Sequence, residues 1–467
     1  MIDVNAVRRD HSLAMSARSR TMPRPFKRLP NVDEAAFSRM VESIEPQWIE
    51  AALVATGTAS VRHRRLPAEQ VLWLVLGMAL YRPEPIHQLV ERLALVLPKD
   101  GSGRIARSSV IQARDRLGDE PMEWLFKRCA SEWAHTSARK HAWRDLALYA
   151  VDGTTLRTPD SPENRAHFGG QGAGEIHGAS GYPLVRVATL MALRTHVLAG
   201  AAFGPYVSEH VYASKLWELV PDGSLMLVDR GFFDAKVLIP LARDGKDRHW
   251  LTRARTSNVW TVIKAFTKND LLVEFKVSKE ARRADPTLPE TWIVRAIRYQ
   301  RPGFAPQFLL TSLLDRVKYP AKEVVALYHE RWEIELGYDE VKTELLDRQE
   351  TLRSKTPRGI AQELWAVGLV YNLVRLEMER IAEEAEVPPT RISFKVALKL
   401  IRDEWMWLSA SDTPGTIPRQ LRELRERIAR YVLPPRREGR TFPRAVKIKM
   451  SNYDRKRPIL PKTPAAK

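Results

Sequence analysis

The chain has little cysteine, the residue that builds disulfides and thiolate metal sites: its 467 residues include one, Cys129. A single cysteine excludes an intrachain disulfide and a cysteine zinc site, and it suits a reducing compartment, so we expect a cytoplasmic protein. Long apolar runs are absent as well. The longest, VLWLVLGMALY at 71–81, falls below the roughly 18 residues that a membrane-spanning helix needs. No apolar segment follows the basic N-terminal stretch, so we expect no signal peptide.

Acidic residues are outnumbered by basic ones. The chain has 75 Lys and Arg against 56 Asp and Glu, which gives a net charge of +19 and a pI near 10. This excess favours a polyanionic partner, since each phosphate that is neutralised releases condensed counterions; an anionic membrane surface is the competing interpretation. The 11 histidines show no ligand-like pairing. A content of 44% apolar and 28% charged residues is typical of a soluble globular protein, and the length allows roughly two to four domains.

Residues 1–140 divide into a basic arm and a helical region. The arm, 1–30, has seven Lys or Arg against two Asp; we expect it to be disordered. Residues 31–140 carry helical periodicity and are predicted to form an N-terminal DNA-binding domain. Within it, the segment SSVIQARDRLG at 108–118 follows a glycine turn and fits a helix-turn-helix reader. A small helical bundle with a solvated basic face explains the same pattern equally well. The candidate DNA contacts are Arg104, Arg107, Arg114 and Arg116.

From residue 145 the pattern changes to strands alternating with helices, which predicts an α/β core containing an antiparallel meander that leads into parallel strands. This core spans 145–255 and 313–357, and a run of alternating strands at 256–312 interrupts it as a β-rich insertion. Long helices follow at 358–435 and are candidates for dimerisation. The tail, 436–467, has eleven Lys or Arg against two acids and is predicted to lie along a phosphate backbone.

Two acids stand where buried strands are predicted. Asp152 interrupts the strand that contains LALYAV, and Asp229 follows the apolar run SLMLV. A carboxylate in such a place is costly unless it is paired or binds a cation, although each one separately is also explained as a turn or N-cap residue. Together with Glu335 they form a set of hard oxygen ligands suited to Mg²⁺ or Mn²⁺. Such a set can hold two ions about 4 Å apart for phosphodiester chemistry.

Glu335 lies in a segment, 326–345, that is predicted to be one helix. At about 100° per residue, Tyr328, Arg331, Glu335 and Lys342 fall within an arc of roughly 60°, beside an apolar stripe. An ordinary surface helix with i,i+4 ion pairs is the alternative. Asp339 falls on the same ridge and is the best alternative to Glu335, whereas Glu333 and Glu340 point elsewhere.

The segment YHERWEIELGYDEVK has the spacing Y-x2-R-x3-E-x6-K. With AVDGTTLRT and LVDRGFF, it resembles the DDE transposases of bacterial insertion sequences, in particular the insertion element four family with its YREK signature. The resemblance covers roughly residues 30–410. It implies a ribonuclease-H-like mixed sheet core with a β-rich insertion, an all-α N-terminal domain and a helical C-terminal region. It also implies that Asp152, Asp229 and Glu335 form the catalytic, metal-binding triad for two Mg²⁺ or Mn²⁺ ions.

The resemblance implies partners and further site residues. Tyr328, Arg331 and Lys342 match the residues that grip the transposon-end backbone, and Trp332 lies at the edge of the same ridge. A flipped base next to the cleavage site has Phe308 and Trp292 as its candidate contacts. The expected partners are double-stranded DNA, both transposon ends and target, and a second copy of the chain in a synaptic complex at the bacterial nucleoid.

The expected activity is cut-and-paste transposition, with binding of terminal inverted repeats, strand nicking, a hairpin intermediate and strand transfer. Two other functions remain open. A metal-dependent nuclease on the same core would cut DNA that lacks terminal repeats. A DNA-binding protein derived from a transposase would bind without catalysis, although an intact set of three acids argues against it.

Overall fold

The computed structural model describes residues 43–59, 67–92, 107–170, 181–301, 304–348, 351–409 and 416–435. The predicted arm at 1–30, the tail at 436–467 and Arg104 lie outside these residues. The side chain of Arg107, at the start of a helix, lies outside them as well. In the part of the chain that is described, no helix combines the length and apolarity needed to span a membrane.

A mixed nine-stranded sheet with the order β3-β2-β1-β4-β5-β9-β8-β7-β6 forms the centre of the described structure. The central strand β1 pairs with β2 in antiparallel and with β4 in parallel orientation, and β4 pairs in parallel with β5. Valine, leucine, alanine and methionine fill β4 and the first half of β1, as expected of strands covered on both faces. The bounds of these strands are β1 Ala147–Arg157, β2 Leu184–Ala192, β3 Leu198–Gly204, β4 Ser224–Val228 and β5 Arg248–Arg253.

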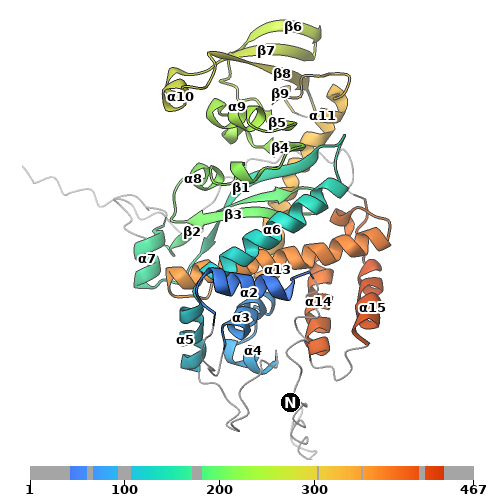
Figure 1. Cartoon of the computed structure of the whole chain (residues 1–467). Coiled ribbons are helices and arrows are strands. Elements are labelled where there is room, and N and C mark those ends of the chain that lie inside the picture. Colours follow the sequence, from blue (N-terminus) through green and yellow to red (C-terminus); the bar gives the residue numbers. More distant parts are fainter. Residues whose placement is uncertain are drawn as a thin grey trace, which may run out of the picture.

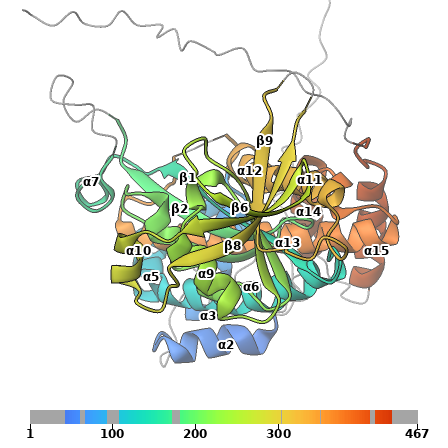
Figure 2. The same ribbon diagram turned by 90° about the horizontal axis from the view of Figure 1, so that it is seen from above.

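The strands predicted as a β-rich insertion continue the central sheet. β9 pairs antiparallel with β5, and β8, β7 and β6 follow in order to the sheet edge. They form the upper part of Figure 1, and in the view from above β6 and β8 cross the centre of the molecule (Figure 2). Their bounds are β6 Thr261–Thr267, β7 Asp270–Lys276, β8 Thr291–Tyr299 and β9 Gln307–Thr311, with α10 Lys279–Ala284 between β7 and β8.

A layer of helices lies below β1–β3 in Figure 1, away from the strands β6–β9. The long helix α13, Pro357–Glu384, is apolar along most of its length and packs against α3 and α6, which come from the N-terminal half. The N-terminal and C-terminal helices therefore share one core. The helices of this layer are α2 Pro46–Ala55, α3 Ala68–Leu80, α4 Ile86–Arg92, α5 Arg107–Leu117, α6 Glu120–Lys140, α14 Phe394–Ser409 and α15 Ile417–Ala429. The helices α2 and α15 lie within the segments predicted to be helical, 31–140 and 358–435, but were not predicted as separate elements.

Short helices connect the strands. Ser161 and Asp234 accept hydrogen bonds from backbone N–H groups at the starts of α7 and α9, which satisfies donors that a helix leaves free. The helices that connect strands are α7 Pro162–Phe168, α8 Glu209–Ala213, η1 Trp217–Leu219, η2 Arg230–Phe232 and α9 Ala235–Arg243, whereas η5 Pro389–Arg391 lies between α13 and α14.

The segment predicted as one helix at 326–345 is not a regular α-helix. It begins with the end of α11, Ala321–Tyr328, tightens into a 3₁₀ segment, η3 (His329–Trp332), continues as α12 (Glu333–Asp339) and ends in a π-helix, η4 (Glu340–Leu345). Such deviations occur often at functional sites. Because they change the rotation per residue, the positions calculated with 100° steps do not hold across the whole segment.

Candidate active site

Asp152 and Asp229 are brought together by the register of two parallel strands. Val151 of β1 pairs with Val228 of β4, so the acid that follows each valine lies at the next step along the same edge. Both side chains are half-buried. Asp152 accepts a hydrogen bond from the Gly153 N–H at 2.8 Å, and Asp229 accepts one from the Gly231 N–H at 3.3 Å as the N-cap of η2. Each carboxylate keeps further lone pairs available.

The helix α12 carries Glu335 to the same strand. The hydroxyl of Tyr338 donates to the backbone carbonyl of Asp152 at 2.6 Å and forms a second hydrogen bond with the Thr189 hydroxyl at 2.8 Å. The preceding residue, Gly337, lies so close to the sheet that a Cβ there would come within 2.4 Å of Met191. A glycine at this position and the tyrosine after it therefore set the close approach of α12 to β1 and β2.

Arg331 lies among these acids. Its Nη2 donates to Oε1 of Glu335 at 2.8 Å, and the arginine side chain is 11% exposed against 37% for the glutamate. The positive charge of Arg331 acts on Asp152, where it lowers the pKa, and the negative charge of Asp229 acts on Arg331. The arginine and the three predicted acids therefore belong to one electrostatic cluster.

The pKa of Asp152 is raised to about 6. The main cause is burial, which disfavours the carboxylate. The Gly153 N–H and Arg331 oppose this effect, while the carboxylates of Glu209 and Glu335 add to it. The ionised form of Asp152 is therefore disfavoured in this site.

Glu209 is a carboxylate of this site that sequence analysis missed. It begins α8, and its Oε2 lies 2.4 Å from the point where a side chain on Gly153 would begin. Its charge raises the pKa of Asp152. The acid stands at the start of the first helix after the third strand, SEHVYASKLWELV, so its place in the order of elements was the available signal.

The other members of the polar ridge take different places. Tyr328 is 7% exposed, and burial raises its pKa; Arg331 opposes this effect, and Asp229 adds to it. Trp332 is 47% exposed, and the Arg331 guanidinium carbon lies 5.6 Å from its ring centroid. Lys342, in the π-helix, lines an apolar cavity of about 60 Å³ together with Tyr338 and Gly337.

Acids that were expected to point elsewhere do so. Glu333 and Glu340 lie on the reverse side of the helix, where His196 contacts Glu333 at 2.9 Å and Glu340 at 3.2 Å. Asp339, the alternative to Glu335, is exposed and accepts a hydrogen bond from the Thr343 hydroxyl at 2.9 Å. It has no contact with the Asp152 cluster among the described residues.

Arg114 does not face outward as a DNA contact would. Its guanidinium donates to Gln362 at 2.9 Å and to Ser354 at 3.1 Å, and burial lowers its pKa. It therefore joins α5 to α13 instead of presenting a charge to DNA, which corrects the prediction for this residue. Arg116 on the same helix is exposed and remains a candidate.

The two residues proposed for a flipped base lie in aromatic packing. Trp292 stacks on Phe233 with 5.4 Å between ring centroids and also contacts Trp250, in the core between β5 and β8. Phe308 packs edge-on against Trp260 at 5.3 Å. The structure brings neither of them together with Asp152 and Glu335, whereas Trp332 lies beside Arg331.

The donor chemistry of the site suits a hard divalent cation, because Asp152, Asp229 and Glu335 offer carboxylate oxygens. The spacing of the side chains, in contrast, does not form a site for one ion. Among the residues that the structure describes, no three acidic, histidine or cysteine side chains are grouped closely enough to hold one ion. In this conformation the Glu335 carboxylate is engaged by Arg331.

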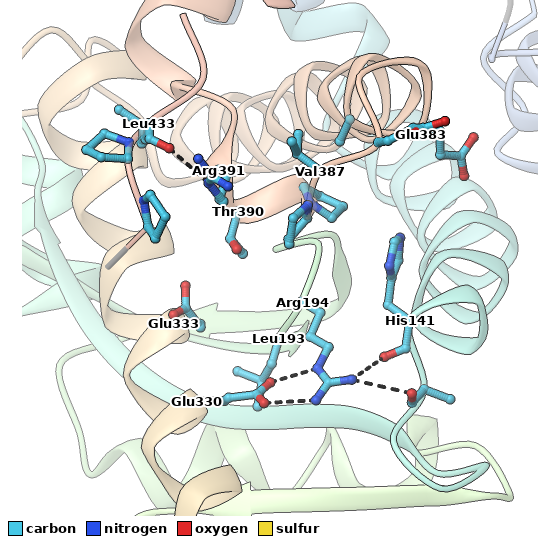
Figure 3. A pocket seen from close by; sticks show the side chains of 17 residues that line it. His141, Leu193, Arg194, Glu330, Glu333, Glu383, Val387, Thr390, Arg391 and Leu433 are labelled. Atoms are coloured by element: carbon cyan, nitrogen blue, oxygen red, sulfur yellow. Dashed lines mark hydrogen bonds and ion pairs between the residues drawn. The ribbon is translucent and has the colours of Figure 1, made fainter. Parts of the chain in front are cut away.

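A larger cavity of about 950 Å³ lies beside the same helix but contains none of the three acids. In Figure 3, Arg194 forms a double ion pair with Glu330, with 2.9 Å for each contact, and Nη1 also donates to the His141 carbonyl at 3.0 Å. On the opposite wall Arg391 donates to the Leu433 carbonyl at 2.9 Å. The cations here are used in internal contacts, so the cavity is not an extension of the active site.

Two family models and two relatives match the sequence of this chain. Residues 34–127 match the family described as "Insertion element 4 transposase N-terminal", and residues 143–373 match "Transposase DDE domain". The chain is 39% identical over 414 residues to "Transposase InsG for insertion sequence element IS4" of Escherichia coli (strain K12), which covers 88% of this chain and 92% of the relative. It is 38% identical over 231 residues to "Putative transposase InsZ" of the same organism, with 49% and 75% covered.

Among solved structures, one similarity is to the "piggyBac transposase synaptic complex with hairpin DNA", with 12% identity, a TM-score of 0.39 and 86% and 85% of the two chains covered. This similarity is too low to carry an argument. The sequence matches define the class of the protein, which is a DDE transposase. Within that class the chain belongs to the insertion element 4 family.

Proposed function

We propose that this transposase binds the terminal inverted repeats of its element and cuts and joins DNA at the site formed by Asp152, Asp229 and Glu335. The observation that carries the proposal is the parallel register of β1 and β4, which sets two acids side by side, beneath a helix that carries the third. The strand order β3-β2-β1-β4-β5 supports a ribonuclease-H-like core. The strands β6–β9 are the insertion of that core.

The nucleophile is a water molecule and then the 3′-hydroxyl that it frees, so no serine or cysteine nucleophile is required. Two Mg²⁺ or Mn²⁺ ions, held by the three acids, would supply charge stabilisation for phosphodiester cleavage. Tyr328, Arg331 and Lys342 bind the backbone phosphates beside Glu335 and fix the scissile bond, since arginine and lysine are the usual phosphate contacts. Catalysis then rests mainly on positioning and charge stabilisation.

The freed 3′-hydroxyl attacks the opposite strand to give a hairpin, and after opening the same site joins the end to target DNA. Two ends are held by two copies of the chain, with helices α13 and α14 as the proposed dimer contact. The exposed Arg116, the side chain of Arg107 and the basic tail contribute to DNA binding, which the net charge of +19 supports.

The test is cleavage of a plasmid that carries the DNA flanking the gene, with Mg²⁺, by wild type, Glu335→Gln and Asp339→Asn. Wild type and Asp339→Asn should release a fragment with fixed, sealed ends, and Glu335→Gln should bind without cutting. Asp339→Asn is the matched control because it removes a carboxylate from the same helix outside the acid cluster. Loss of cutting in Asp339→Asn alone would contradict the role of Glu335. Cutting at random positions would favour a nuclease, and binding without cutting by all three would favour a DNA-binding protein.

A further inference from the structure

The charges in the active site are not balanced by the protein groups placed among them. Asp152, Asp229, Glu335 and Glu209 contribute four carboxylates, and the guanidinium of Arg331 is the cation whose charge acts on Asp152 and which contacts Glu335. Burial alone would lower the pKa of Arg331, but Tyr328 and the carboxylates around it outweigh burial, and the pKa is raised. The site therefore holds the guanidinium firmly in its charged form.

We propose that Arg331 is the resident cation of this site, which holds Glu335 until a DNA phosphate withdraws the guanidinium. Divalent-cation binding and DNA binding are then coupled through a single side chain. This inference rests on the proposed function and adds to it the order in which the site is assembled.

The argument for exchange begins with competition for the same oxygens. A guanidinium that donates to Glu335 at 2.8 Å and a cation that needs that carboxylate cannot both be satisfied. This explains why three donors of the right chemistry do not group closely enough to hold one ion among the described residues. With Arg331 displaced, the Glu335 carboxylate is free to turn toward Asp152, whose pKa already responds to its charge.

Exchange also has a low cost. Glu335 is 37% exposed, so water can solvate its carboxylate when the guanidinium leaves. A phosphate is the better partner, because two parallel N–H donors of arginine match two phosphate oxygens. The exposed ring of Trp332, 5.6 Å from the guanidinium carbon, offers a surface on which the group can rest as it moves outward.

A permanent structural pair is the alternative, since arginine and glutamate four residues apart on a helix often pair. The two cases differ in a measurable way. If Arg331 blocks the site, its removal raises the affinity for a divalent cation. If the pair only supports the helix, removal leaves the affinity unchanged or lowers it.

The experiment measures Mn²⁺ binding by electron paramagnetic resonance, in the full-length protein, with and without a saturating duplex taken from the DNA that flanks the gene. The proteins are wild type, Arg331→Gln, Arg331→Lys and Arg283→Gln. Arg283 is an exposed residue of α10, far along the chain from the site, and controls for the loss of one positive charge. Circular dichroism melting confirms that each variant is folded.

Without DNA, Arg331→Gln should bind Mn²⁺ about 5–150-fold more tightly than wild type, which is the usual range of such couplings. Arg331→Lys should stay near wild type because it keeps the charge, and Arg283→Gln should match wild type. DNA should raise the Mn²⁺ affinity of wild type by a similar factor and leave that of Arg331→Gln unchanged.

Equal Mn²⁺ affinities of wild type and Arg331→Gln without DNA would overturn the inference, and so would a full response of Arg331→Gln to DNA. In either case the proposed function would stand if wild type still bound the duplex and cut it. If wild type bound neither the duplex nor Mn²⁺, both proposals would fall. Wild type measured with and without DNA tests the coupling even if Arg331→Gln does not fold.

Discussion

The segment α12–η4, which carries Glu335, contacts one group of acids on each side, and the pKa values of the two groups shift in opposite directions. On the reverse side Glu340 is held by Tyr371 at 2.6 Å, His196 at 3.2 Å and Arg375 at 3.3 Å. Burial alone would raise the pKa of Glu340, but Arg375 and His196 outweigh it, and the pKa falls to about 2. On the front, burial and neighbouring acids raise the pKa of Asp152 to about 6.

The two sides therefore have different roles, one structural and one functional. The reverse cluster pairs its acids with cations and hydrogen-bond donors, so it stabilises the position of the helix. The front cluster leaves carboxylates without sufficient counter-charge, which is the state in which a site binds cations and phosphates. Because the two clusters contact opposite sides of the segment α12–η4, substitutions on its two sides should give separable effects.

The largest effect is expected from the front acids. Asp229→Asn or Asp152→Asn should lower the rate of DNA cleavage by about 10³-fold or more, since a site of this kind depends on charge stabilisation, while DNA binding persists. Single-turnover cleavage and gel-shift binding measure the two properties. Glu333→Gln, on the reverse side, is the matched control. If Glu333→Gln abolished cleavage of folded protein as completely as Asp229→Asn, the two sides would not be distinct.

The next effect is expected on the reverse side. Glu340→Gln should lower the free energy of unfolding at pH 7 by about 3–4 kcal/mol, because the pKa falls from 4.5 to about 2, each unit of depression corresponds to about 1.4 kcal/mol, and Arg375 loses its carboxylate partner. A depressed carboxyl pKa stabilises the fold fully above the ordinary value of 4.5 and loses this effect as the pH falls toward about 2. Urea unfolding at pH 7 and near pH 3 should therefore show the difference between wild type and variant shrinking. A constant difference would contradict the pairing.

Asp152→Asn should stabilise the metal-free protein, by about 3 kcal/mol at pH 8. The sign follows from the raised pKa: the protonated acid fits the fold, so wild type gains stability below its ordinary value of 3.8 and loses it as the pH rises through about 6. The advantage of the variant should therefore vanish near pH 4. Thermal melting in EDTA across this range measures it. A variant that is less stable than wild type at pH 8 would contradict the shortage of positive charge around Asp152.

The smallest effect is expected from Tyr338→Phe, which removes the hydrogen bond to the Asp152 carbonyl and keeps the ring. A hydrogen bond of this kind contributes about 1 kcal/mol, so cleavage should slow by up to about tenfold with little change in DNA affinity. Thr343→Val, which removes the contact with Asp339 on the exposed side, is the control. Equal rates for wild type and Tyr338→Phe would mean that the tyrosine does not help to position the helix.

Several elements could be predicted because their signals are local. The buried runs ending in Asp152 and Asp229, and the strands at 261–311, follow from apolar composition and alternation. Two helices, α2 and α15, lie in segments predicted to be helical but were not predicted as separate elements. In α15 the buried residues are Leu421, Leu424 and Ile428, a sparse stripe in a highly charged segment, so packing against α13 decides its stability.

The sequence by itself determined which acids stand in or after buried strands, the spacing of Tyr328, Arg331, Glu335 and Lys342, and the family. It could not determine that Arg114 turns inward, because burial of an arginine depends on Gln362 and Ser354, more than 200 residues away. Nor could it place Glu209 beside Gly153, or bring the Arg331–Glu335 pair, which the i,i+4 spacing suggests, close to Asp152 and Asp229. These are contacts between elements distant along the chain, and only the packing of α8, α12 and β1 fixes which charges meet.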